Sequence, residues 1–332
     1  MLALAGVKAP PADLDTALVR GVLDQQWGIR TVDLRYLPVG FGDHHWQANA
    51  AGQRYFVTVR DLRLDGRTND PNQALPLLEQ TFQAVRRLRD LAELAFVVPP
   101  VPSTSGALVV PIGSTFALSV YDWLDVHPVQ DAEGVIAAGL VGSLHRAWLE
   151  HPVEAVREDF RIPHRSALTG ALADLGRPWL DGPYGEPARA LLTAHQEDVR
   201  SALEQYDVLV ATAGGPMSEW CLTHGEPSGG NLVRDQTGAC YLVDWESARI
   251  GPPERDLVEL AWSEEALSRY RAFAGGPAPN AERLRLYRLW YALAETSVYL
   301  LQFRAPHSAD DNMVESWQNF LRFLPGRPGS RC

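Results

Sequence analysis

Hydrophobic and polar residues follow one pattern in the first third of the chain and another in the rest. Apolar residues at helical spacing occupy 11–28. Residues 31–62 then alternate between apolar and polar, with breaks at Gly40, Gly42 and the pair 51–52. Alternation of period two is typical of strands with one buried face, and glycine gives the backbone freedom that tight turns need. This region therefore predicts a helix followed by three strands joined by turns.

Beyond these strands, helical spacing predominates. Residues 75–94 place apolar side chains on one stripe of a helix, and 107–112 and 115–124 predict a further strand pair. Further helical repeats follow at 134–150, 186–206, 284–303 and 312–324. Strands followed by helices predict an α+β, two-lobed fold. We expect a β-rich N-terminal lobe over 1–122 and a mainly helical C-terminal lobe over 123–332.

Composition and charge narrow the class of protein. The 332 residues are 46% hydrophobic with a formal net charge of −11, which fits a globular chain long enough to bury a core without disulfides or metal ions. Such a charge argues against binding to nucleic-acid phosphates. The three cysteines lack zinc-ligand spacing, and no apolar run reaches the roughly 18 residues of a membrane span. We expect a cytoplasmic protein with no nucleic-acid or membrane partner, and its oligomeric state stays open.

The strongest chemical signal is the stretch HGEPSGGN, residues 224–231, followed thirteen residues after Asn231 by Asp244. Two β-like runs with a turn at 235–238 lie between them, which predicts a hairpin that brings Asn231 and Asp244 together. Amide and carboxylate oxygens are ligands suited to Mg²⁺. Glu226 is then placed to accept a proton from a substrate hydroxyl. The alternative is a polar loop before a hairpin, but the combined spacing favours the first interpretation.

These segments resemble the aminoglycoside phosphotransferase and choline kinase family of protein-kinase-like enzymes. LTHGEPSGGNLV is similar to the family's catalytic loop, and YLVDWESARIGPPERDLVELA to its metal-binding segment. GLVGSLHRA is similar to a helix of these proteins, and LSVYDWLDV to their interlobe hinge. The resemblance covers most of the chain in order, although only the two loop segments are specific. It implies transfer of the γ-phosphate of ATP or GTP, with Mg²⁺, to a hydroxyl of a small molecule.

The resemblance also implies roles for individual residues. Glu226 falls on the catalytic base, and Asn231 and Asp244 on the metal ligands. His224 would support the catalytic loop, although it could equally be a satisfied polar residue at a loop start. Asp256 would be the structural carboxylate that holds the loop.

The nucleotide would be held by the N-terminal lobe and the hinge. The base would meet the backbone of Val120, Tyr121 and Asp122. The glycine turn of Gly40 and Gly42 would cover the phosphates. We interpret His44 and His45, which follow this turn, as a solvated loop tip rather than as ligands of phosphate or metal.

Two positions depart from the family pattern, and Glu226 in place of Asp is the first. The extra methylene moves the carboxylate by roughly 1.5 Å, and a misplacement of about 1 Å can cost on the order of a hundredfold in rate. Glu and Asp nevertheless have nearly the same basicity, and a shifted loop could absorb the added length.

The second departure is Thr58, which stands where the phosphate-pairing lysine is expected. Lys8 is the only lysine, because the 30 basic residues otherwise consist of 29 arginines. Arg60, two residues along the same strand face, either reaches back to phosphate or is solvated at the strand end. Glu79 is either the ion-pair partner of that cation or an exposed residue early in its helix.

Two further sets of residues bear on the acceptor. An aromatic run at helical spacing, expected mainly in the core, could turn a ring or two to the acceptor pocket: Tyr287, Trp290, Tyr291 and Tyr299. Four acidic residues either attract a cationic substrate or, by default, form a solvated face: Glu259, Glu264, Glu265 and Glu295.

The sequence therefore predicts a Mg²⁺-dependent small-molecule O-phosphotransferase acting on an amine-bearing hydroxyl compound such as an aminoglycoside. Drug resistance or ordinary metabolism would be its role. The rival hypothesis is a catalytically silent binding protein that keeps the kinase fold, and Thr58 and Glu226 are its support. A hydrolase would need a nucleophile motif such as GxSxG, which the chain lacks. The sequence names neither the acceptor nor the choice between ATP and GTP.

Overall fold

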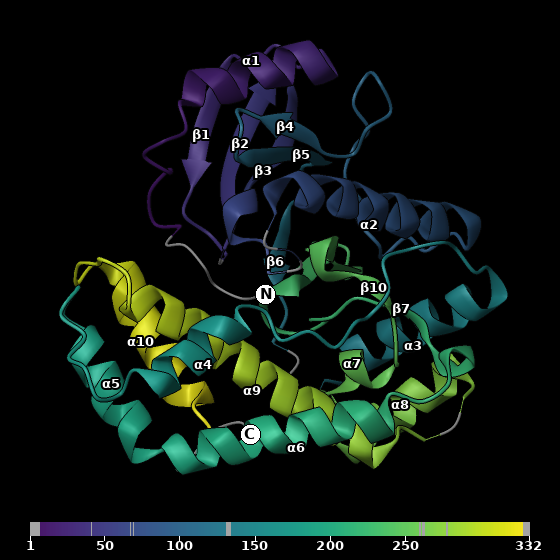
Figure 1. The fold of residues 1–332 in the computed structure, drawn as a ribbon. Helices are drawn as coiled ribbons and strands as arrows, with labels where there is room; N and C mark the ends of the chain where they lie inside the picture. The colour runs from purple at the N-terminus through teal and green to yellow at the C-terminus, as the bar shows by residue number, and fades with distance from the viewer. Residues whose placement is uncertain are drawn as a thin grey trace.

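The computed structural model describes residues 7–40, 42–66, 68, 70–130, 134–258, 260, 263–276 and 278–327. Within these ranges, an antiparallel sheet with two helices forms one end of the molecule, and the other end is mainly helical (Figure 1). This is the α+β architecture that the order of strands and helices predicts.

The sheet at the first end has five antiparallel strands. In spatial order they are β1 (Asp33–Leu37), β2 (His44–Ala50), β3 (Gln53–Asp61), β5 (Phe116–Asp122) and β4 (Val110–Ile112). The three strands predicted over 31–62 are confirmed. Their second turn also lies where predicted, because Ala51 and Gly52 both have positive φ.

The two faces of the sheet differ as the alternation predicts. Val57 and Val59 of β3 are fully buried against α1 (Thr16–Trp27), in one hydrophobic cluster with Leu23. The alternate residues of β3 point the other way. We call this second side the cleft face, because four of its side chains line a cavity between the sheet and the helical part: Thr58, Arg60, Ser119 and Tyr121.

Helix α2 (Pro71–Leu91) connects the sheet to the helical part. Asp70 caps its first turn by accepting the N–H of Asn72, and Pro71 takes the first helical position, where its missing N–H costs nothing. Its buried stripe joins one hydrophobic cluster with α3 (Val135–Glu150) and α8 (Glu264–Ala274). The predicted stripe is confirmed: Leu78, Phe82, Val85 and Leu88 are all buried.

The remaining elements surround two small sheets. One sheet pairs β10 (Arg249–Gly251) with β7 (Cys221–Thr223), and the other orders β6 (Val126–Pro128), β8 (Leu232–Asp235) and β9 (Cys240–Leu242). The other α-helices are α4 (Arg165–Ala173), α5 (Gly185–Ala194), α6 (Gln196–Ala213), α7 (Glu254–Leu257), α9 (Ala281–Phe303) and α10 (Asp311–Phe323). The described residues also form four short 3₁₀ turns: η1 (Leu62–Leu64), η2 (Met217–Glu219), η3 (Gly229–Asn231) and η4 (Trp245–Ser247).

One predicted helix, 186–206, is wrong as a single element. The chain forms α5 and α6 instead, and His195 between them has φ −115° and ψ 14°, outside the helical range. Apolar spacing runs on through this break because both helices bury one face in the same cluster. Periodicity alone therefore could not reveal it.

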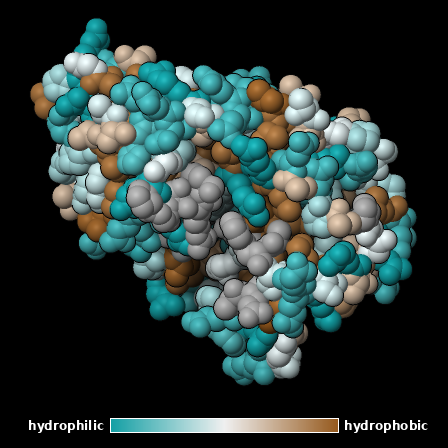
Figure 2. All heavy atoms as spheres, turned by 90° about the horizontal axis from the view of Figure 1, so that it is seen from below, coloured by the Kyte–Doolittle hydropathy of each residue, from teal (hydrophilic) through white to brown (hydrophobic). Residues whose placement is uncertain are grey.

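One face of the molecule is mixed in polarity. Seen from below the view of Figure 1, hydrophobic atoms lie in small groups among hydrophilic ones (Figure 2), which is ordinary for a protein surface. In the part of the chain that the structure describes, no helix has both the length and the apolar character needed to cross a membrane.

Candidate active site

A buried carboxylate holds the start of the loop 224–231. Asp256, in α7, accepts hydrogen bonds from the backbone N–H groups of His224 (2.8 Å) and Gly225 (2.6 Å). A third bond joins it to Nε2 of His145 on α3 at 3.0 Å, and His145 in turn contacts the hydroxyl of Tyr270. Burial would raise the pKa of Asp256, but His145, His224 and Arg255 hold it below its usual range. Asp256 thus fixes the loop backbone, as the family resemblance implies.

His224 links the loop to the strand before Asp244. Its Nδ1 accepts the N–H of Glu226 at 3.2 Å, so the proton is on Nε2, which donates to the carbonyl of Val243 at 2.9 Å. Burial lowers the pKa of His224 although Asp256 opposes this. The ring is therefore neutral and packs edge-on against Trp245, with centroids 4.4 Å apart. These contacts make His224 a support of the loop.

The hairpin of β8 and β9 brings Asn231 and Asp244 to one end. Leu232 pairs with Leu242, and the N–H of Val243 donates to the carbonyl of Asn231 at 3.0 Å. The amide nitrogen of Asn231 donates to the carbonyl of Glu226 at 3.0 Å, which leaves the amide oxygen as an acceptor. Asp244 follows the strand in a left-handed conformation, φ +70°.

This donor set fits a divalent cation such as Mg²⁺. Burial raises the pKa of Asp244 well above its usual range, and the neighbouring Glu246 adds to the effect, so a cation there would favour the ionised carboxylate. Among the described residues, no group of three or more His, Cys, Asp or Glu side chains could hold a metal ion. Asn231 and Asp244 offer two protein oxygens, and Mg²⁺ commonly draws its other ligands from substrate oxygens and water.

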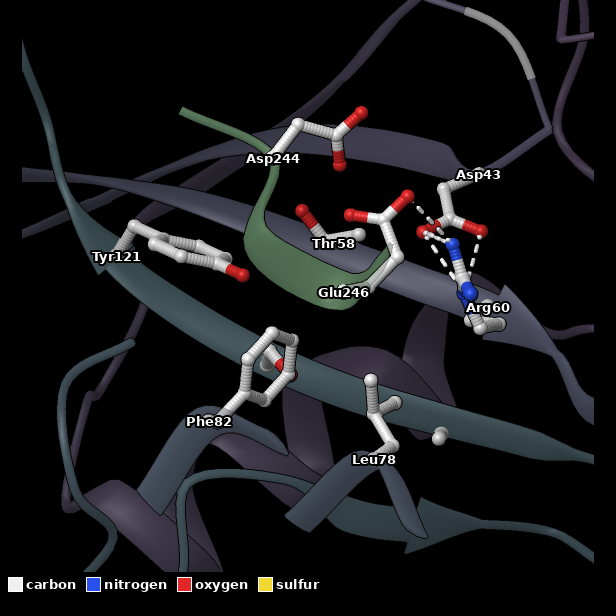
Figure 3. Close-up of a pocket in the computed structure, with 10 residues that line it drawn as sticks. Asp43, Thr58, Arg60, Leu78, Phe82, Tyr121, Asp244 and Glu246 are labelled. Atoms are coloured by element: carbon white, nitrogen blue, oxygen red, sulfur yellow. Dashed lines mark hydrogen bonds and ion pairs between the residues drawn. The ribbon is translucent and has the colours of Figure 1, made fainter. Parts of the chain in front are cut away.

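The cavity beside Asp244 contains a buried arginine between two carboxylates (Figure 3). The guanidinium of Arg60 binds Asp43 through Nε and Nη2, at 3.0–3.1 Å, and lies 2.9 Å from Glu246. Burial would raise the pKa of Glu246, but Arg60 lowers it to about 2. Burial raises the pKa of Asp43 to about 6 against the opposing effect of Arg60. The guanidinium of Arg60 thus pairs with two carboxylates inside the cavity.

The model that describes the phosphotransferase enzyme family matches residues 33–295. The chain belongs to this family. The match covers both the sheet and the catalytic segments, and it makes a small-molecule phosphotransferase the class of enzyme. Protein StrN of Streptomyces griseus is 29% identical over 250 residues, which are 71% of this chain and 73% of that protein.

Solved structures support the protein-kinase-like fold of this phosphotransferase. Spectinomycin phosphotransferase APH(9)-Ia, in complex with ADP and spectinomycin, has a TM-score of 0.71 at 15% identity, covering 95% of this chain and 96% of the other. Choline kinase LicA from Streptococcus pneumoniae has a TM-score of 0.57 at 14% identity, covering 93% and 98%. A microcompartment-associated aminopropanol kinase has a TM-score of 0.57 at 16% identity, covering 92% and 94%.

Several expectations for the phosphotransferase's nucleotide side are wrong. Arg60 is buried rather than solvated, and its partners are Asp43 and Glu246 rather than Glu79. Glu79 accepts instead the backbone N–H groups of residues 108 and 109, at 2.9 and 3.0 Å. These N–H groups precede an edge strand and need an acceptor, which a helix carboxylate supplies.

The histidines after the glycine turn do not form a solvated loop tip. Both lie in β2, His44 is buried with its Nδ1 2.9 Å from the hydroxyl of Tyr36, and His45 is half-buried on the cleft face. Gly40 and Gly42 form the expected turn between β1 and β2, with φ of +76° and +82°.

At the hinge, the carbonyl of Val120 accepts the N–H of Val101 at 2.6 Å. Tyr121 directs its ring into the cavity (Figure 3), and Asp122 lies at the exposed end of β5. That the backbone of these three residues meets the nucleotide base stays a prediction.

The aromatic and acidic residues considered for the acceptor site differ in how deeply they are buried. Glu295 is only 2% exposed and accepts the hydroxyl of Tyr299, so it is part of the core and not of an acidic surface. Tyr287 and Tyr299 are also core residues, whereas Trp290 and Tyr291 are partly exposed. Glu264 and Glu265 form the exposed first turn of α8, and Glu259 lies outside the described residues.

Three residues of the site do not follow from the motifs in the sequence: Asp43, Glu246 and His145. Asp43 directly follows the glycine turn and Glu246 lies two residues after Asp244, so nearness to the motifs was the available signal. His145 lies in GLVGSLHRA, the segment similar to a helix of the family, but nothing local indicates its pairing with Asp256, which is 111 residues away.

Proposed function

We propose that this phosphotransferase transfers the γ-phosphate of ATP or GTP, with Mg²⁺, to a hydroxyl of a small amine-bearing molecule. The observation that supports this is the hairpin that places Asn231 and Asp244 together beside the loop of Glu226. Nucleotide binding is supported by structural neighbours that were solved with ADP and with AMP. We place the boundary between the two lobes at residue 122.

Each residue has a role that its surroundings permit. Asn231 and Asp244 would hold Mg²⁺, which when bound would neutralise charge on the transferring phosphate. Glu226 would accept the proton of the acceptor hydroxyl, since its backbone is fixed on both sides by His224 and Asn231. Such catalysis is chiefly positioning and charge neutralisation, and the rigid mounting of the loop meets that need.

The acceptor class follows from the neighbours and from charge. Spectinomycin, choline and aminopropanol, which name the three solved relatives, each combine a hydroxyl with a nitrogen that is cationic near neutral pH. The chain's net charge of −11 is compatible with such a substrate. The competing function, a silent kinase-fold binding protein, is favoured by Thr58 and by the enclosure of Arg60 between two acids.

The test compares wild type with Asp244→Asn and Glu226→Gln. Asparagine tolerates the left-handed backbone of Asp244 and removes only the charge. Saturating Mg-ATP or Mg-GTP should raise the melting temperature of wild type by mass action and raise that of Asp244→Asn much less. Glu226→Gln should bind nucleotide normally, yet release ADP or GDP with amine-bearing alcohols roughly 10²–10⁴-fold more slowly.

Two results would count against the proposal, each in a different way. If millimolar nucleotide gives no metal-dependent rise in the melting temperature of wild type, the protein is not a kinase. A rise without phosphate transfer to any of spectinomycin, choline, aminopropanol or a panel of aminoglycosides would favour the silent binding protein.

A further inference from the structure

The glycine turn covers a region without a lysine. The amine of Lys8, the only lysine of the chain, lies 3.7 Å from Glu315 on α10. Arg60 is on the cleft face, but Asp43 and Glu246 already bind it. These acids bind its Nε and Nη2, and a phosphate that displaced either carboxylate would leave a buried charge unpaired, which is costly. The proposed function therefore favours a second phosphate-binding group on the cleft face.

A row of polar side chains crosses the cleft face over β2, β3 and β5. The register pairs His45 of β2 with Thr58 of β3, and Thr58 with Ser119 of β5. Nδ1 of His45 lies 3.2 Å from the hydroxyl oxygen of Thr58. Because Thr58 stands where the family lysine is expected, this row occupies the place of the missing cation.

His45 is also held under the glycine turn. A Cβ on Gly40 would lie 3.2 Å from Nε2 of His45, so the imidazole's second nitrogen faces the turn. The ring packs against Phe56 with centroids 4.8 Å apart and planes 32° apart. A hydrogen bond from Thr58 to Nδ1 would leave Nε2 as the N–H donor beneath the turn.

We infer that His45, oriented by Thr58, binds the terminal phosphates of the nucleotide in place of the family's lysine. This inference rests on the proposed nucleotide-dependent function. Imidazole offers one N–H donor when neutral and two when protonated. It would therefore bind phosphate more weakly at high pH than a lysine does, which makes nucleotide affinity sensitive to pH.

The charges around His45 give this sensitivity its direction. Burial lowers the pKa of His45 to about 4, Glu246 of η4 opposes this, and His44 of β2 and Arg60 of β3 add to it. A bound di- or triphosphate adds negative charge beside the ring and favours its protonated form. Nucleotide binding should then take up a proton, and affinity should rise as pH falls from 8 to 6.

The test measures ADP and AMP binding by titration calorimetry, with Mg²⁺, to wild type, His45→Ala and the double variant His45→Ala/Thr58→Lys. His127→Ala, an exposed histidine of β6, is the matched control. We expect His45→Ala to weaken ADP on the order of 10- to 100-fold, as loss of a charge-assisted hydrogen bond does. AMP, which lacks the terminal phosphates, should change less than about twofold. The added lysine should restore much of the ADP affinity and abolish its pH dependence.

The possible outcomes distinguish a failure of this inference from a failure of the proposed function. Equal weakening of ADP and AMP would show a structural role for His45 and overturn the inference. Unchanged or tighter ADP binding in His45→Ala would also overturn it, and tighter binding would identify the ring as an obstruction. If wild type binds neither ADP nor AMP, the proposed function itself is wrong.

Discussion

Two backbone conformations in the site are ones that most residues avoid. Asp244 has φ +70° and Gly225 has φ +105°. Non-glycine residues rarely take positive φ, and such strain is most often stored at functional sites. At Asp244 the surrounding contacts hold the strained backbone. At Gly225 only glycine is compatible, because a Cβ there would lie 2.6 Å from a guanidinium nitrogen of Arg255.

Gly225→Ala should therefore damage the loop through both strain and collision. Arg255 cannot move aside, since it donates to the hydroxyl of Thr223 and the carbonyl of Ser247, both at 2.9 Å. We expect a loss of about 2–4 kcal/mol in the free energy of unfolding and loss of transferase activity. Gly238→Ala is the control, because it has φ +92° but nothing within 4 Å of its Cβ, and should cost about 1–2 kcal/mol. Equal effects of the two changes, measured by chemical unfolding, would show that Arg255 does yield.

At the level of residues, the sequence predicted the groups that lie within a motif and missed those brought in by the fold. The roles of Glu226, Asn231 and Asp244 follow from spacing and resemblance, and they stay predictions. The partners of Arg60 could not be found in this way. Residue spacing gives strand faces, but Glu246 reaches Arg60 from an element almost 190 positions later, so only the packed structure reveals the pair.

At the level of elements, the loop 224–231 depends on a buried ion-pair group behind it. Glu158 lies 3.3 Å from both Arg249 of β10 and Arg255 of α7 and accepts the N–H groups of Asp159 and Phe160. Burial would raise the pKa of Glu158, but the two arginines hold it below its usual range. The carboxylate thus joins a loop, a strand and a helix.

Glu158→Gln should destabilise the protein by about 3–5 kcal/mol, because it removes the carboxylate that two buried arginines share. Glu219→Gln is the control: Glu219 is 53% exposed and its partner Arg283 keeps Glu254 at 3.8 Å, so this change should cost only about 1 kcal/mol. Midpoints of urea unfolding, compared at one pH, give the difference. A Glu158→Gln protein as stable as the control would mean that water or local rearrangement compensates the arginines.

Elements were predictable where the local pattern reflects burial. The strands of the first sheet have one covered face, so strict alternation revealed them. Short β6 was missed, because three residues between loops have no measurable period and are defined by pairing with β8. The break at His195 was missed for the opposite reason, since the apolar pattern continues through it.

At the scale of the molecule, Arg60 joins its two ends. The arginine and Asp43 belong to the sheet, whereas Glu246 follows the hairpin of the helical part. Two carboxylates share this single guanidinium, with Asp244 close by, as Figure 3 shows. Folding brings these three carboxylates close together, and their repulsion costs free energy. A proton taken up by the cluster on folding reduces that cost.

The stability of the whole molecule should therefore respond to pH through Asp43. Its pKa is raised from 3.8 to about 6 on folding, chiefly by burial. The folded protein binds the proton more tightly, so this contribution is present at low pH and is lost as pH rises through 6. Between pH 5 and 7.5 the loss amounts to about 1–1.5 kcal/mol. Asp43→Asn cannot titrate. From pH 5 to 7.5, wild type should therefore lose about 1–1.5 kcal/mol of unfolding free energy relative to Asp43→Asn. Urea unfolding of both proteins at fixed ionic strength measures this change. A difference independent of pH would mean that Arg60 keeps Asp43 ionised throughout, and that the cluster holds no proton in the folded state.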